Sequence, residues 1–142
     1  MIGFIANNEL LARYITSSRW FRKQDQTIKQ DAFIPPENLM ELSVTRHINL
    51  TENDIWNIGQ VIVRGTPRTL YGRADVEVGH VIAQRLSVVS QPVSDNQNHA
   101  NIVGWPLAKN DRKMLALEIA RVARFVATPE AGAQTLPLLT VK

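Results

Sequence analysis

The stretch 98–106 concentrates side chains that can do acid–base chemistry around a short apolar run. His99 carries an imidazole, which exchanges a proton near neutral pH, so it is a candidate general acid or base. Residues two apart share one face of a strand, so Asn101 would lie beside it and orient a substrate or donate to a developing negative charge. Trp105 precedes Pro106, whose geometry fixes its direction, so it is expected to be a core or rim anchor. In the structural alternative, His99 satisfies a buried backbone group and the asparagines shape a turn.

A second candidate is the pair Arg46-His47, near the end of a predicted strand. Adjacent strand residues face opposite ways, so at most one of the pair points into a given pocket. If His47 and His99 lie on neighbouring strands, their imidazoles would form a metal-independent acid/base pair, with Arg46 as the phosphate ligand. That chemistry suits cleavage of RNA through its own 2′-hydroxyl. His99, His47 and Asn101 are therefore the candidate catalytic residues.

A third candidate is the segment from Tyr71 to Asp75, in which a glycine permits a close approach of another group. In a strand Tyr71, Arg73 and Asp75 would share one face. Arg73 would then be an anion clamp held in place by Asp75. The alternative is a surface ion pair worth about 0–1 kcal/mol.

Basic and aromatic residues interleave between positions 13 and 29, where five residues are basic and one is acidic. Single-stranded nucleic acid needs this combination, because cations neutralise phosphates and exposed rings stack on bases at about 1–3 kcal/mol each. The hypothesis requires Trp20 and Phe21 to be exposed; the alternative places both rings in the core. The candidate binding residues are Arg13, Arg19, Trp20, Arg22, Lys23, Arg46, Tyr71, Arg73 and Trp105.

Composition limits the class of protein. The 142 residues are enough for one domain, and the apolar fraction of 44% with a charged fraction of 20% is typical of a globular chain. No run approaches the roughly 18 apolar residues of a membrane span, and the N-terminus lacks the basic region of a signal peptide. The chain contains no cysteine, which excludes disulfides, thiolate catalysis and cysteine-ligated zinc. We therefore expect a cytoplasmic protein without a membrane segment. Its net charge of +3 is small, but its basic patches favour a polyanionic partner, the alternative being a basic solvated surface.

Motifs for cofactors are missing. The three histidines, at positions 47, 80 and 99, have no helical or loop spacing that would form a metal site. The sequence has no glycine-rich nucleotide loop, no Walker lysine and no Gly-x-Ser-x-Gly elbow. We therefore expect neither a metal ion nor a cofactor.

The clearest element is a helix that begins after Thr51. Thr51 and Asp54 form a capping box, and Leu50 with Ile55 are placed as a hydrophobic staple. Helical spacing then continues to position 62, and Gly65 followed by Thr66-Pro67 ends the helix.

The other elements are less distinct. Residues 8–20 read either as a helix capped by Asn8 or as a strand over 12–20. Residues 41–48, 86–89 and 100–103 are predicted strands, 69–76 a short strand or loop, and 78–86 either a helix or an alternating segment. A helix is predicted from position 110, with a stripe of Leu115, Ile119, Val122 and Val126.

This order of elements predicts a single α+β domain over residues 1–142, with a mainly antiparallel sheet and two or three helices packed on one face. Residues 128–142 would be an extended tail, apolar from Leu136 to Val141. The leading functional hypothesis is a nucleic-acid-binding accessory protein whose partner is single-stranded RNA or another polyanion. One alternative is a nuclease or other phosphate-ester-directed enzyme using His47 and His99. The other is a subunit that pairs with itself or a partner protein through Leu136–Val141.

Overall fold

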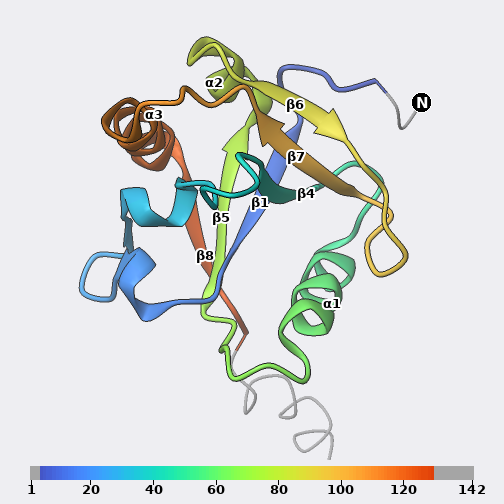
Figure 1. Ribbon diagram of the computed structural model, residues 1–142. Helices are drawn as coiled ribbons and strands as arrows, with labels where there is room; N and C mark the ends of the chain where they lie inside the picture. The colour runs from blue at the N-terminus through green and yellow to red at the C-terminus, as the bar shows by residue number, and fades with distance from the viewer. Residues whose placement is uncertain (1–3, 130–142) are drawn as a thin grey trace, which may run out of the picture.

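The computed structural model describes residues 4–129, which form a six-stranded antiparallel sheet with three α-helices packed against it (Figure 1). The strand order is β6-β7-β4-β1-β5-β8. The strands are β1 (Leu10–Ile15), β4 (Leu42–Arg46), β5 (Gly72–Glu77), β6 (Ser87–Ser90), β7 (His99–Val103) and β8 (Arg124–Ala127). The helices are α1 (Glu52–Val63), α2 (Val78–Ala83) and α3 (Lys109–Val122). A small hairpin of β2 (Phe21–Arg22) and β3 (Thr27–Ile28) lies between the 3₁₀ helices η1 (Ser18–Trp20) and η2 (Gln30–Phe33).

Helix α1 forms where its local signals predict it. The Thr51 hydroxyl accepts a hydrogen bond from the Asp54 amide at 3.1 Å, and the Asp54 carboxylate accepts one from the Thr51 amide at 3.0 Å. This capping box satisfies amides that have no partner inside the helix. After the helix, Gly65 adopts φ +77°, a conformation that glycine takes without steric cost. The predicted helix and its capping box are confirmed.

The ambiguous segment near the N-terminus is a strand. β1 lies in the middle of the sheet, paired on one side with β5 along its whole length and on the other with β4. Its residues alternate between two cores: Leu11 and Ile15 pack in one, and Ala12 and Tyr14 in the other. The helix alternative for this segment is therefore wrong. The strand also starts earlier than the predicted one and stops at Ile15, before η1.

The two faces of the sheet carry different helices. The larger core holds Leu11 and Ile15 of β1 with Val81 of α2 and Ile119 of α3, so two helices share one face as predicted. Helix α1 packs on Tyr14 and the rest of the smaller core, on the opposite face. Figure 1 shows this arrangement, with α2 and α3 on one side of the sheet and α1 away from them.

The last helix is shorter than the apolar stripe predicts. α3 ends at Val122, and Val126 lies instead in β8, where it pairs with Arg73 of β5. The spacing was consistent with a longer helix, but pairing to the edge of β5 gives the backbone of residues 124–127 its hydrogen-bond partners. The segment 78–86 divides into α2 and a connection to β6, so its helical alternative is confirmed up to Ala83. The predicted tail, including Leu136–Val141, lies mostly outside the described residues.

Candidate functional site

A pocket of about 530 Å³ lies where β1 and β4 stop pairing. β1 pairs with β4 only at Leu11–Arg46 and Ala12–Thr45, so the sheet opens beyond these residues. A volume of this size is in the range of small-molecule sites. The pocket is lined by Arg13, Tyr14, Thr16, Trp20, Ile34, Pro36, Ser43, Val44, Thr45, Ile62, Arg68, Asn96 and His99.

Arg13 is the central cation of this pocket. Its Nε donates to the Ala32 carbonyl at 2.8 Å and its Nη1 to the Ser43 carbonyl at 3.1 Å, which fixes the guanidinium in the gap between the strands. The guanidinium carbon lies 5.0 Å from the centre of the Trp20 ring. Burial, and then the charge of Arg68, lower the pKa of Arg13 to about 10, so the group is still a cation at neutral pH. Two of its five N–H groups are used in these bonds, which leaves donors for a ligand.

Arg68 is the second cation of the pocket and is not among the binding residues predicted from the sequence. It is exposed and lies in the connection between α1 and β5, about forty residues along the sequence from the basic segment 13–29. None of the described residues that line the pocket is acidic, so no lining carboxylate neutralises the two guanidinium groups. A single arginine after Pro67 forms no recognisable sequence motif. It reaches the pocket of Arg13 only because the connection from α1 to β5 runs past that pocket.

His99 enters the same pocket from β7. Its Nδ1 lies 2.9 Å from the carbonyl oxygen of Gln91. A carbonyl oxygen only accepts, so Nδ1 carries the ring proton in the neutral imidazole and Nε2 is the acceptor. His99 therefore presents an oriented ring to the pocket, and its bond to a backbone carbonyl resembles the structural alternative given for this residue.

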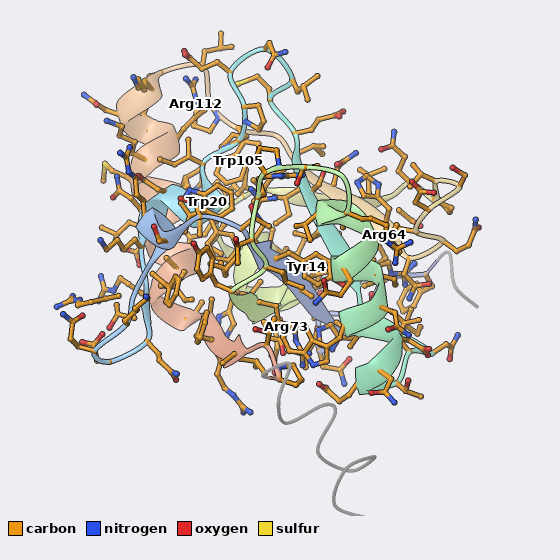
Figure 2. The ribbon with its side chains drawn as sticks, turned by 90° about the horizontal axis from the view of Figure 1, so that it is seen from below. Tyr14, Trp20, Arg64, Arg73, Trp105 and Arg112 are labelled. Carbon is orange, nitrogen blue, oxygen red and sulfur yellow. The ribbon has the colours of Figure 1, made fainter. Side chains whose placement is uncertain are left out.

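The wall of the pocket beside α1 consists of polar groups that already have partners. The Asn96 amide donates to the Thr45 hydroxyl at 2.8 Å, and the Tyr14 hydroxyl donates to the Ile55 carbonyl of α1. Burial raises the pKa of Tyr14 to about 12, so it stays a neutral phenol. Figure 2 shows Tyr14 beside the green helix α1, with Trp20 further away beside the blue ribbon.

The two histidines of the nuclease hypothesis line different pockets. His47 belongs to a second pocket of about 330 Å³, where its Nε2 lies 3.0 Å from Asp75 Oδ1. His99 lies in the first pocket with Arg13. Asn101 is buried, and its amide donates to the Gln91 side chain at 2.6 Å, so it holds the β6–β7 connection. The fold therefore separates His47 from His99, whereas Asn101 and His99 both bind Gln91.

Arg73 is neither an open anion clamp nor a surface ion pair. Its side chain is 3% exposed, with Nε 3.0 Å from Asp75 and both Nη atoms 2.9 Å from the Glu52 carboxylate. Its guanidinium also lies 4.8 Å from the centre of the Trp56 ring. Burial raises the pKa of Asp75, but the hydrogen bonds and charges of His47 and Arg73 outweigh it and hold that pKa below its ordinary value. The network therefore joins β5 to the first turn of α1.

Other predicted binding residues are part of the interior. Arg46 is fully buried, and its guanidinium binds the carboxylate of Glu9, which removes it from the set of phosphate ligands that the sequence suggests. Trp105 is a core anchor whose indole donates to the Ile102 carbonyl at 2.9 Å. Tyr71 is partly buried, with its ring 5.5 Å from that of Phe21.

The basic segment itself lies at the surface. Arg19, Arg22 and Lys23 are exposed on η1 and the small hairpin, and Arg22 lies 3.6 Å from Asp25. Trp20 is partly exposed, as the nucleic-acid hypothesis requires. Phe21 is buried and stacked on Phe125 at 4.8 Å, which contradicts its predicted exposure. The alternation of a strand sends Phe21 inward while the neighbouring charge stays in water.

Within residues 4–129, no group of three histidine, aspartate or glutamate side chains is placed to hold a metal ion. The same residues contain no helix with the length and apolar character needed to cross a membrane. No protein-family model, no curated protein and no solved structure matches this chain.

Proposed function

We propose that this protein is a cytoplasmic single-stranded nucleic-acid-binding protein, and that the pocket between β1 and β4 holds a phosphate group. One observation carries the proposal. Arg13 and Arg68 line one pocket in which none of the described lining residues is acidic. The two positively charged guanidinium groups repel each other, and the charge of Arg68 contributes to the lowered pKa of Arg13. A bound phosphate removes that repulsion.

The aromatic ring beside Arg13 supports a nucleotide rather than a simple inorganic anion. The guanidinium carbon lies over the Trp20 ring, 5.0 Å from its centre, and the group is anchored by two backbone carbonyls. Planar guanidinium groups and aromatic rings are the surfaces on which unstacked bases pack. Since Arg13 is already oriented, little of its side-chain entropy is lost when it binds.

The exposed cations next to the pocket support a chain of nucleotides rather than one. Arg19 precedes Trp20 in η1, and Arg22 and Lys23 follow it on the β2–β3 hairpin. A strand whose phosphate occupies the pocket would meet further positive charge there. By contrast, nuclease action by the His47 and His99 pair has no support, because the two side chains line separate pockets.

The test compares two arginines of the same connection. Arg64 and Arg68 are both exposed, and only Arg68 lines the pocket. A fluorescein-labelled single strand of about 12 nucleotides would be titrated at two or more salt concentrations and followed by anisotropy. We expect Arg68→Ala to weaken binding about three- to tenfold and to reduce the salt slope by about 0.7. Arg64→Ala removes the same charge and is expected to change binding less than twofold.

Two results would overturn the proposal. One is no binding of the labelled strand by the wild-type protein at low salt. The other is an equal loss in both arginine variants, because binding would then follow net charge rather than the pocket.

A further inference from the structure

We propose that this pocket selects RNA over DNA, because the Nε2 atom of His99 accepts a hydrogen bond from a ribose 2′-hydroxyl. The inference rests on the proposed function and concerns the same site. Its starting point is the ring orientation of His99, which is fixed by a hydrogen bond to a backbone carbonyl.

The bond to the Gln91 carbonyl is 2.9 Å long and uses the Nδ1 proton. Gln91 is held in turn, because its own amide donates to the His99 carbonyl at 2.8 Å and its side chain accepts from Asn101 at 2.6 Å. The ring therefore has one defined tautomer and one defined attachment. Nε2 is therefore a hydrogen-bond acceptor, and the His99 side chain lines the same pocket as the cations Arg13 and Arg68.

A phosphate offers oxygen acceptors to Arg13 and Arg68 and has no proton to give to His99. The group next to a phosphate in RNA that does have one is the 2′-hydroxyl, a donor and an acceptor that DNA lacks. A site with both guanidinium donors and an imidazole acceptor therefore matches the phosphate and the ribose hydroxyl of one RNA nucleotide. An acceptor left without its donor in the bound state weakens the complex, so deoxyribose is disfavoured.

The experiment uses three labelled strands with one sequence of adenine and cytosine, so that the bases are identical in all of them. They are RNA, DNA and 2′-O-methyl RNA, and the last keeps the ribose but removes the hydroxyl proton. We expect the full-length protein to bind RNA about five- to tenfold more tightly than the other two strands, as measured by anisotropy.

His99→Ala is expected to remove the preference, so that RNA and DNA bind with the same affinity. His80→Ala is the matched control, since His80 is exposed and lines the pocket of His47 rather than that of His99. His99→Gln keeps an acceptor near the position of Nε2 and is expected to retain part of the preference. Circular dichroism of each variant confirms that it is folded.

The outcomes separate the two proposals. Equal binding of all three strands by the wild type overturns the RNA preference and leaves the nucleic-acid function standing. An RNA preference that persists in His99→Ala, or an equal loss for RNA and DNA, also overturns the role of His99. If none of the strands binds, the proposed function fails and this inference fails with it.

Discussion

The guanidinium of Arg46 is paired with the carboxylate of Glu9 inside the protein, with Nε 2.6 Å from Oε2 and Nη2 2.9 Å from Oε1. The side chain of Arg46 is fully buried and that of Glu9 is 7% exposed. Nη2 also donates to the Phe4 carbonyl at 2.8 Å. The pair ties the segment before β1 to the end of β4, so a residue that resembles a phosphate ligand in the sequence has a role in the stability of the fold.

Glu9→Ala is expected to lower the free energy of unfolding by about 3–5 kcal/mol, because it leaves the Arg46 charge buried without its carboxylate. Urea unfolding followed by circular dichroism measures this change. Glu37→Ala serves as the control: Glu37 is 70% exposed and lies 3.8 Å from Arg112, so its loss is expected to cost less than about 1 kcal/mol. Similar losses in the two variants would contradict the importance of the buried pair.

Asp75→Asn is expected to destabilise the protein at pH 7 by about 3 kcal/mol, since Arg73 is buried and Asp75 supplies part of its charge balance. The pKa of Asp75 lies below its ordinary value, so the folded state binds this proton more weakly than the unfolded chain does. Its contribution to stability is therefore present above the ordinary pKa and is lost as the pH falls through the lower, folded value.

The urea midpoints of the wild type and Asp75→Asn should consequently approach one another as the pH falls below about 4. Asp111→Asn, in the first turn of α3, provides an exposed aspartate for comparison. A constant difference between wild type and Asp75→Asn from pH 7 down into the acid range would show that the carboxylate charge is not the cause.

Tyr14 is expected to ionise late in an alkaline titration. Burial raises its pKa from 10.0 to about 12, so the folded state keeps the proton that the unfolded chain loses. The stability that Tyr14 contributes is therefore complete below pH 10 and is lost as the pH rises towards 12. Phenolate absorbance measures the ionisation, and Tyr14→Phe should remove the late step.

The chain has two tyrosines, so Tyr71→Phe is the natural control and should leave the late step in place. Tyr14→Phe also removes the hydrogen bond to the Ile55 carbonyl, which we expect to cost about 1 kcal/mol in urea unfolding. A late step that disappears in Tyr71→Phe instead would contradict this assignment.

Trp20 is expected to report nucleic-acid binding. The chain has three tryptophans, of which Trp56 and Trp105 are 8% and 6% exposed, whereas Trp20 is partly exposed and lines the pocket. A base that packs against the Arg13–Trp20 pair should quench the fluorescence of Trp20. Trp20→Phe keeps a ring beneath Arg13 and should abolish the change in signal. Quenching that persists in this variant would place the ligand elsewhere.

Local chemistry was enough to predict α1. Thr51 and Asp54 lie three residues apart and satisfy each other's amides, so the information is contained within one turn. The alternation of apolar residues likewise predicted β4, and the order of elements predicted an α+β fold with an antiparallel sheet. Some segments fit both the helical and the strand spacing of apolar residues, and their structure depends on pairing with neighbouring strands. The segment of Leu11 and Tyr14 became the strand β1 because it fills the gap between β4 and β5.

The sites depended on contacts between distant parts of the chain. By itself the sequence determined the basic, cysteine-free composition, the residue types available for binding and the helix α1. Only the tertiary structure decided that Arg73 binds Glu52, that His47 and His99 line different pockets, and that Arg68 lies in the pocket of Arg13. The reason is physical: a cap or an amphipathic face is set by neighbours along the chain, whereas a charge finds its partner or its pocket only after strand register and helix packing bring remote residues together.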